Sequence, residues 1–138
     1  MRFLLDTNVI SELRKSDKGN QQVWRWASGI DDQESAISAI TLMELQYGAL
    51  LGRTKNSALS GELIRWISES VRPRYEGRIL AVDEAVALRC AQLIHPRTRP
   101  LNDSLIAATA LVHDLIVVTR NVDDFGPMGV RLLNPWST

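Results

Sequence analysis

The sequence predicts an α/β sandwich with a mainly parallel, five-stranded sheet. Three observations predict this fold. Short apolar runs alternate with longer amphipathic stretches, most of the apolar runs are hydrophobic on both sides, and helical patterns fill the gaps between them. The 138 residues are enough to bury one core, so we expect a single domain over residues 1–138.

Five short apolar runs are the predicted strands. They cover residues 3–5, 36–37, 79–82, 116–118 and 130–133. Because most of them lack a polar side, they suit a sheet that is covered by helices on both faces.

The first two of the six predicted helices show apolar faces, and the third has capping signals at its ends. The first two have such faces at Val9, Ile10 and Leu13, and at Val23, Trp26 and Ala27. The third is predicted over residues 41–51, since Thr41-x-x-Glu44 has the spacing of a capping box and Gly52 follows the last apolar residue.

Three further helices complete the pattern. Residues 57–70 place Leu59, Leu63 and Trp66 at helical spacing. Asp83 is the predicted N-cap of a helix that ends near residue 94, before Pro96, and Asn102 is the predicted N-cap of the last helix, to about residue 113. Since helices separate most of the strands, the strands are expected to run in parallel.

Composition excludes several classes of protein. Lys and Arg (16) balance Asp and Glu (16), and the 45% of hydrophobic residues is ordinary for a globular protein. Cys90 is the single cysteine, so no internal disulfide forms, and with only His95 and His113 a structural zinc site is not expected. The apolar stretch 105–118 is too short and too polar to span a bilayer, and the N-terminus has no signal-peptide core. We therefore expect a cytoplasmic protein without a membrane partner.

Acidic residues gather at one predicted edge of the sheet. Asp6 ends the first strand, and the helix that holds Glu44 begins after the second. Asn121 and Asp124 follow the fourth strand. Asp103 starts the helix that leads back to the amino end of that strand, which places it at the carboxyl edge as well. Ligands bind at the carboxyl edge of parallel sheets, so we expect the four acids to meet there.

Each acid also has a purely structural explanation. Asp6 can cap the following helix, and Glu44 can be the return partner of Thr41 in the capping box. Asp103 can interact with the dipole of its helix, and Asp124 can be a turn residue. Four separate structural roles do not explain why all four acids fall at the same edge of the sheet, so their shared position favours a common function.

Carboxylates that are packed together repel one another, and without a cation at least one of them should take up a proton. Mg²⁺ and Mn²⁺ prefer oxygen ligands in octahedral geometry and keep several waters. Two such ions about 4 Å apart can activate a water and stabilise the leaving oxygen in phosphodiester cleavage. The acid set therefore indicates a divalent-metal nuclease.

Four segments resemble, in order, the motifs of PIN-domain nucleases. They are residues 4–12 (LLDTNVISE), 38–48 (SAITLMELQYG), 102–110 (NDSLIAATA) and 118–125 (VTRNVDDF). The ending at residues 133–136 (LNPW) is similar to the VapC-type and FitB-like subgroup. The order and spacing match across nearly the whole chain.

The resemblance implies a PIN-like α/β/α sandwich and the toxin of a type II toxin–antitoxin pair. VapC-type toxins are Mg²⁺- or Mn²⁺-dependent endoribonucleases, usually homodimers, that a small antitoxin holds inactive. The antitoxin carries the DNA-binding part. The implied partners are therefore an RNA substrate, a cognate antitoxin, a second copy of the chain, and operator DNA only through the antitoxin.

The family's acidic set maps onto Asp6, Glu44 and Asp103. The resemblance implies that Asp6 and Asp103 hold the principal metal, and that Glu44 completes the cluster and orients the attacking water. The fourth acidic position is open between two residues. Asn121 stands where some relatives have an acid, and Asp124 offers a carboxylate one helical turn later.

Polar neighbours of these acids are the expected supporting residues. Thr7 and Asn8 follow the first strand and Thr119 follows the fourth, so they are expected to hold Asp6 in place or to meet substrate. A structural role is an equal alternative for each of these three residues.

Three arginines come closest in sequence to the metal end. We expect Arg97, Arg99 and Arg120 to contact RNA phosphates, because the planar guanidinium suits phosphate. Ion pairs with carboxylates of the antitoxin or of the surface are an equally good alternative.

Two other functions compete with the metal nuclease. A phosphatase with an aspartate nucleophile needs a second acid two positions after the first, where this chain has Asn8. A catalytically weak PIN module would act mainly by binding its antitoxin in a DNA-binding, operon-repressing complex. Asn121 keeps this second alternative open.

Overall fold

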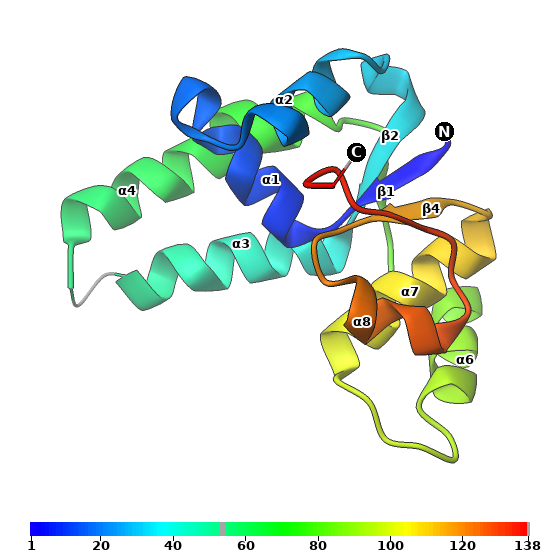
Figure 1. Cartoon of the computed structure of the whole chain (residues 1–138). Helices are drawn as coiled ribbons and strands as arrows, with labels where there is room; N and C mark the ends of the chain where they lie inside the picture. The colour runs from blue at the N-terminus through cyan, green and yellow to red at the C-terminus, as the bar shows by residue number, and fades with distance from the viewer. Residues whose placement is uncertain (53–54, 138) are drawn as a thin grey trace.

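The computed structural model describes residues 1–52 and 55–137, in which five strands form one sheet. The strands are β1 (Phe3–Leu5), β2 (Ser35–Ser38), β3 (Ile79–Leu80), β4 (Ile116–Val118) and β5 (Leu132–Leu133). Figure 1 labels three of them, β1, β2 and β4. Their order is β3-β2-β1-β4-β5, and every neighbouring pair is parallel. The predicted five-stranded parallel sheet is confirmed.

Two of the strands are shorter than predicted. β3 ends at Leu80, because the chain turns there toward Asp83, the N-cap of the next helix. β5 begins only at Leu132, because Gly129 adopts a left-handed turn (φ 77°) just before it.

Helices cover both faces of the sheet. They are α1 (Thr7–Arg14), α2 (Gln21–Ser28), α3 (Ala39–Leu51), α4 (Ser57–Trp66), α5 (Arg72–Arg74), α6 (Glu84–Leu93), α7 (Leu101–His113) and α8 (Val122–Phe125). A π-helical turn, Ile67–Val71, joins α4 to α5. Within the described residues, no helix is both long and apolar enough to cross a membrane.

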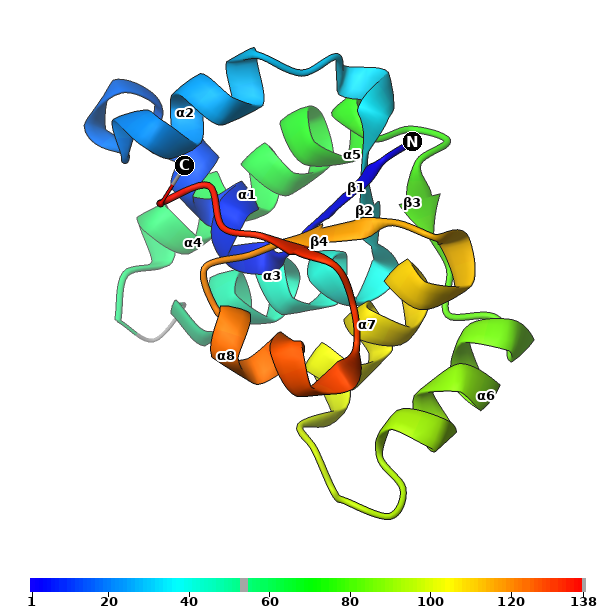
Figure 2. The ribbon, with the colours of Figure 1, turned by 45° about the vertical axis from the view of Figure 1, so that its right-hand side comes forward.

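Side chains alternate between two hydrophobic cores along each strand. Phe3 and Leu5 of β1 belong to the core under α1, α2, α3 and the α4–α5 region. Leu4, between them, belongs to the opposite core, which α7 and α8 cover. α6 packs on the outside of α7 through Val86 and Cys90 (Figure 2). The alternation has the period of a strand, so both faces of the sheet are buried and the site can only form at an edge.

The N-terminus of α3 differs from the predicted capping box. Ser38 is the N-cap, and its Oγ accepts a hydrogen bond from the Ile40 backbone N–H at 3.0 Å. Thr41 lies inside the helix and is fully buried, so the Thr41–Glu44 capping box is wrong. The helix starts earlier because β2 ends directly at its cap. The Glu44 carboxylate is therefore not used as a capping partner.

The last long helix also starts earlier than predicted. The N-cap of α7 is Pro100, so the prediction of Asn102 as the cap is wrong. The fixed φ of proline suits the entry into a helix, and it places Asn102 within the first turn. The prediction that Asp83 caps α6 is confirmed, since its carboxylate accepts from the Val86 backbone N–H at 3.0 Å.

The strand order places β1 at the centre of the sheet. The chain leaves β1 toward β2 and β3 on one side, and later returns as β4 on the other side. β1 and β4 therefore flank the point at which the topology reverses. Crevices that bind ligands form at the carboxyl ends of such strands. The residues that follow these two ends are Asp6 and Thr119.

Candidate active site

Asp6 is the most buried acid of the site. Its side chain caps α1 by accepting a hydrogen bond from the Thr7 backbone N–H at 2.8 Å, and it also accepts from Thr119 Oγ1 at 2.7 Å and Asn8 Nδ2 at 3.3 Å. The residue is only 4% exposed. Burial raises the pKa of Asp6 above its usual value, although the bonds from Thr119 and Thr7 oppose that rise. Asp6 is thus a helix cap and part of an acidic cluster at once.

Thr7 links the first two acids. Its backbone N–H binds Asp6, and its Oγ1 donates a hydrogen bond of 2.6 Å to Glu44 Oε1. Glu44 lies near enough for its charge to contribute to the raised pKa of Asp6. The first turn of α1 therefore fixes both carboxylates relative to each other, although they are far apart in sequence.

Asp103 lies in the first turn of α7 and is half-buried. Its pKa is raised to about 6, first by desolvation and then by the negative charges of Asp6, Glu44 and Asp124. The structure thus brings together four carboxylates, from the N-cap of α1 and from α3, α7 and α8. None of the ion pairs within the described residues involves any of the four.

The two candidates for the fourth position have different surroundings. Asp124, on the exposed side of α8, contributes negative charge to the surroundings of Asp103. Asn121 precedes α8, and its backbone N–H donates to Thr119 Oγ1 at 2.9 Å. Asp124 therefore contributes charge to the cluster, and Asn121 anchors the turn that carries it.

Thr119 connects these segments from a fully buried position. Its hydroxyl donates to Asp6 and accepts from the Asn121 backbone, with Asn8 Nδ2 at 3.4 Å. Since the only hydroxyl proton goes to Asp6, the direction of the network is fixed.

The three predicted phosphate contacts lie in different surroundings. Arg120 is exposed, with its guanidinium 5.3 Å from the centre of the Trp136 ring. Arg99 is partly buried, and its Nε donates to the Leu93 carbonyl at 3.0 Å, which ties the α6–α7 loop to the end of α6. Arg97 is exposed on the same loop. Of these three arginines, only Arg120 is the sequence neighbour of a residue that binds one of the four acids, since Thr119 donates to Asp6.

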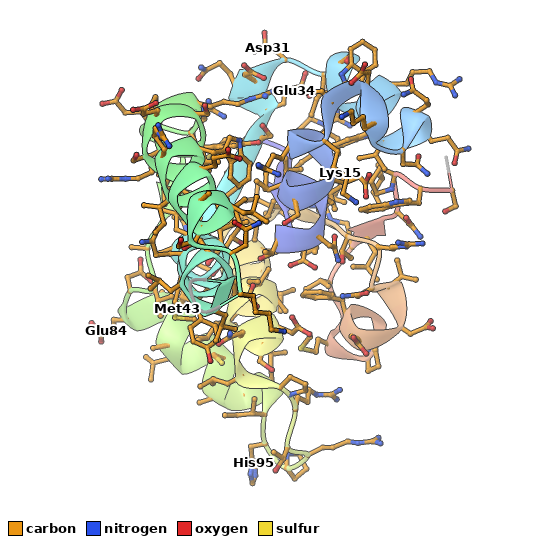
Figure 3. All side chains as sticks on the ribbon, turned by 90° about the vertical axis from the view of Figure 1, so that its left-hand side faces the viewer. Lys15, Asp31, Glu34, Met43, Glu84 and His95 are labelled. Carbon is orange, nitrogen blue, oxygen red and sulfur yellow. The ribbon has the colours of Figure 1, made fainter. Side chains whose placement is uncertain are left out.

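A groove beside the cluster was not predicted from the sequence. It has a volume of about 290 Å³ and is lined by Thr7, Ser11 and Arg14 of α1, by Glu44, and by apolar residues of α3 and of the α4 region. Lys15, the C-cap of α1, also lines it and is labelled in Figure 3. The signal was present in the sequence, because positions 7, 11, 14 and 15 fall on one face of a helix.

The donor set of the cluster fits a hard divalent cation. All the available donors are oxygens, and three neighbouring carboxylates, those of Asp6, Glu44 and Asp124, add negative charge around Asp103. In residues 1–52 and 55–137, no three His, Cys, Asp or Glu side chains are close enough to hold an ion directly. Mg²⁺ suits such a spacing, since it usually binds through one or two carboxylates and keeps several waters.

A family model described as PIN domain matches residues 3–126. The chain belongs to the PIN-domain family. The matched range begins with β1 and ends just after α8, so this PIN domain includes all four carboxylates. The resemblance drawn from the four sequence motifs is confirmed.

Relatives of this PIN domain cover nearly its whole length. Toxin FitB of Neisseria gonorrhoeae is 38% identical over 97% of this chain and 98% of its own, and VapC ribonuclease Y4jK of Sinorhizobium fredii is 31% identical over 97% of each. The crystal structure of FitAcB from Neisseria gonorrhoeae has a TM-score of 0.87 and 36% identity, covering 99% of both chains. That of DNA-bound VapBC from Salmonella typhimurium has a TM-score of 0.76 and 28% identity, covering 98% of both.

Proposed function

We propose that this PIN-domain protein is the toxin of a toxin–antitoxin pair and acts as a divalent-metal-dependent endoribonuclease. One observation carries the proposal: four carboxylates from separate elements meet at the carboxyl edge of β1 and β4 without a cationic partner among the described residues. Relatives named toxin FitB and VapC ribonuclease support it.

The cluster's residues have distinct roles in this proposal. Asp6 and Asp103 hold Mg²⁺ or Mn²⁺, directly or through its waters, and Glu44 completes the site and orients the attacking water. When bound, the ion supplies a water of lowered pKa and positive charge beside the leaving oxygen. Thr7 holds the Glu44 carboxylate in place, as Thr119 does for Asp6.

The fourth acid and the arginines act further from the metal. Asp124 supplies the fourth carboxylate, and Asn121 positions the turn before α8. Arg97, Arg99 and Arg120 contact the phosphates of the RNA on either side of the cut. Asn8 keeps the Asp6 carboxylate oriented.

The partners in this proposal are those of a toxin. The protein works in the cytoplasm as a homodimer, a cognate antitoxin inhibits it, and operator DNA is bound only through that antitoxin. The structural neighbour VapBC of Salmonella typhimurium, which is DNA-bound, supports the last point.

Expression in a bacterial host tests the proposal. We expect wild-type protein to arrest growth and to cleave RNA, and Asp103→Asn to relieve both effects while remaining folded. Glu84→Gln is the matched control, because it also removes an acid from the first turn of a helix, and Glu84 is not among the charges that raise the pKa of Asp103. Cleavage by folded Asp103→Asn at the wild-type rate would refute the assignment.

The dependence of RNA cleavage on a divalent metal is tested separately on purified protein. EDTA is expected to stop cleavage, and Mg²⁺ or Mn²⁺ to restore it. Full activity in metal-free buffer would refute the metal-dependent mechanism. Growth arrest without RNA cleavage would favour the antitoxin-binding module instead.

A further inference from the structure

A second hollow borders the carboxylate cluster on the other side of α3. It has a volume of about 500 Å³ and is lined by Met43, Glu44, Tyr47, Gly48 and Asn102. This size falls within the range of about 300 to 1,000 Å³ that is typical of ligand pockets. Glu44 belongs to both the hollow and the cluster, and Asn102 is the neighbour of Asp103 in α7. The hollow is therefore continuous with the proposed active site.

Two large side chains of this hollow are exposed instead of packed. Tyr47 is 61% exposed and Met43 is 47% exposed, and Met43 is labelled on the surface of α3 in Figure 3. Neighbouring exposed apolar side chains that line a hollow are typical of a surface that a ligand covers. Tyr47 and Met43 thus form an apolar wall next to charged oxygens.

Asn102 supplies polar groups to the same hollow. Because Pro100 caps α7, the Asn102 side chain is not used as a cap. Within the described part of the chain, its amide makes no hydrogen bond. A primary amide presents two donors and one acceptor, which match the edge of a nucleobase.

Gly48 keeps the hollow open. It lies in the interior of α3, where glycine is less favourable than alanine by about 0.5–1 kcal/mol. Close packing does not require it, because an added Cβ would meet nothing within 4 Å. Gly48 lines both this hollow and the groove beside α1. Its missing side chain leaves room on both sides of Glu44.

We propose that this hollow binds an unpaired RNA base next to the cleaved phosphate. The Tyr47 ring stacks on the base, Met43 packs against it, and the Asn102 amide hydrogen-bonds its edge. Proteins recognise single-stranded RNA by stacking bases on aromatic rings and reading their edges with polar groups. The inference rests on the proposed nuclease function and adds the residues that select the base beside the cut.

Cleavage of a single-stranded RNA library of random sequence tests this inference, with the cut ends mapped by sequencing. The variants are Tyr47→Leu, Tyr47→Phe and Asn102→Ala. Leu51→Ala is the matched control, because Leu51 is also exposed on α3 (58%) but does not line the hollow. Light scattering of each variant reports its oligomeric state.

We expect Tyr47→Leu to lower kcat/KM by about tenfold or more, as for the loss of one stacked base. Tyr47→Phe keeps the stacking surface and should retain the wild-type rate. Asn102→Ala should relax the base preference at one position beside the cut, and Leu51→Ala should change neither rate nor preference.

The opposite results separate this inference from the proposed function. Wild-type rate and base preference in Tyr47→Leu, with Asp103→Asn inactive, would overturn the base pocket and leave the nuclease standing. Absence of RNA cleavage by the wild-type protein would refute both. Conversion of a dimer into monomers by Tyr47→Leu would show that the hollow is covered by a second copy, which also overturns the base pocket.

Discussion

Thr119 Oγ1 donates a hydrogen bond of 2.7 Å to Asp6 Oδ2, and this bond joins the carboxyl ends of β4 and β1. Both residues are buried, so water cannot replace the bond. The same hydroxyl accepts from the backbone of Asn121, so one side chain determines where an acid and the start of α8 lie.

Replacement of Thr119 by Val should destabilise the protein by about 1–3 kcal/mol at pH 7, since a buried carboxylate loses a donor. Thr119→Ser keeps the hydroxyl and should lose less. Because the bond favours the ionised form, its loss raises the pKa of Asp6 further, and the difference from wild type should shrink at low pH, where Asp6 is protonated. Urea unfolding of the three proteins at two pH values measures this, and equal stability of Thr119→Val and wild type would contradict it.

Asp103→Asn should stabilise the metal-free protein at neutral pH. The pKa of Asp103 is about 6 in the folded state and 3.8 in the reference state, so the folded state binds more protons between these values. The wild-type protein therefore loses stability as pH rises from about 4 through 6. Since Asp103 is partly solvated, we expect a gain of about 1 kcal/mol at pH 7.5 for the variant. Thermal unfolding in EDTA checks it, and a gain that does not vary with pH would show that the Asp103 charge is not its cause.

Divalent metal should stabilise the wild-type protein more than Asp103→Asn. Mg²⁺ that binds only the folded wild-type protein raises its stability by about 2.7 kcal/mol at a concentration one hundred times the Kd. Asp103→Asn, which removes a proposed ligand charge, should show a much smaller rise. A titration of the melting temperature with MgCl₂ measures the effect, and equal rises in the two proteins would contradict the proposed ligand.

Thr7→Val should slow cleavage without unfolding the protein. The variant keeps the backbone N–H that binds Asp6 but loses the hydroxyl that holds Glu44. A misplaced catalytic group can cost up to about 100-fold in rate, and we expect a loss of about tenfold or more in kcat. Thr7→Ser should recover most of the rate. A rise in KM alone, with kcat unchanged, would show that Thr7 acts on substrate binding instead.

Arg120→Gln should weaken RNA binding and flatten its dependence on salt. A single phosphate contact on single-stranded RNA contributes about 0.7 to the slope of log K against log salt. Arg131→Gln is the control, because Arg131 pairs with Asp114 at the amino edge of the sheet. Fluorescence anisotropy of a labelled single-stranded RNA in EDTA gives both slopes. The same slope in Arg120→Gln as in the wild type would exclude a phosphate contact.

Much of the fold was predictable because it depends on local patterns. Strands buried on both faces leave short apolar runs, and a parallel sheet brings the ends of β1 and β4 to one edge whatever lies between them. For this reason the meeting of Asp6 with Asp103 could be inferred from sequence.

Features that depend on tertiary context could not be inferred. Thr41-x-x-Glu44 has the spacing of a capping box, but β2 runs directly into α3 and Ser38 becomes the cap. Likewise, Pro100 and not Asn102 is the N-cap of α7. The π-helical turn after α4 has no pattern in the sequence that marks it. The groove beside α1 was detectable, but only by reading Arg14 and Lys15 together with Thr7.

The central position of β1 makes its pairing in the sheet depend on a strand that is synthesised much later. β1 is made first, yet its second neighbour, β4, ends at residue 118, and Asp124 follows still later. A nascent or prematurely terminated chain that stops before β4 leaves one side of its most buried strand without hydrogen-bond partners. Such a fragment also lacks Asp124, so the four carboxylates can meet only after β4 and α8 have both been synthesised.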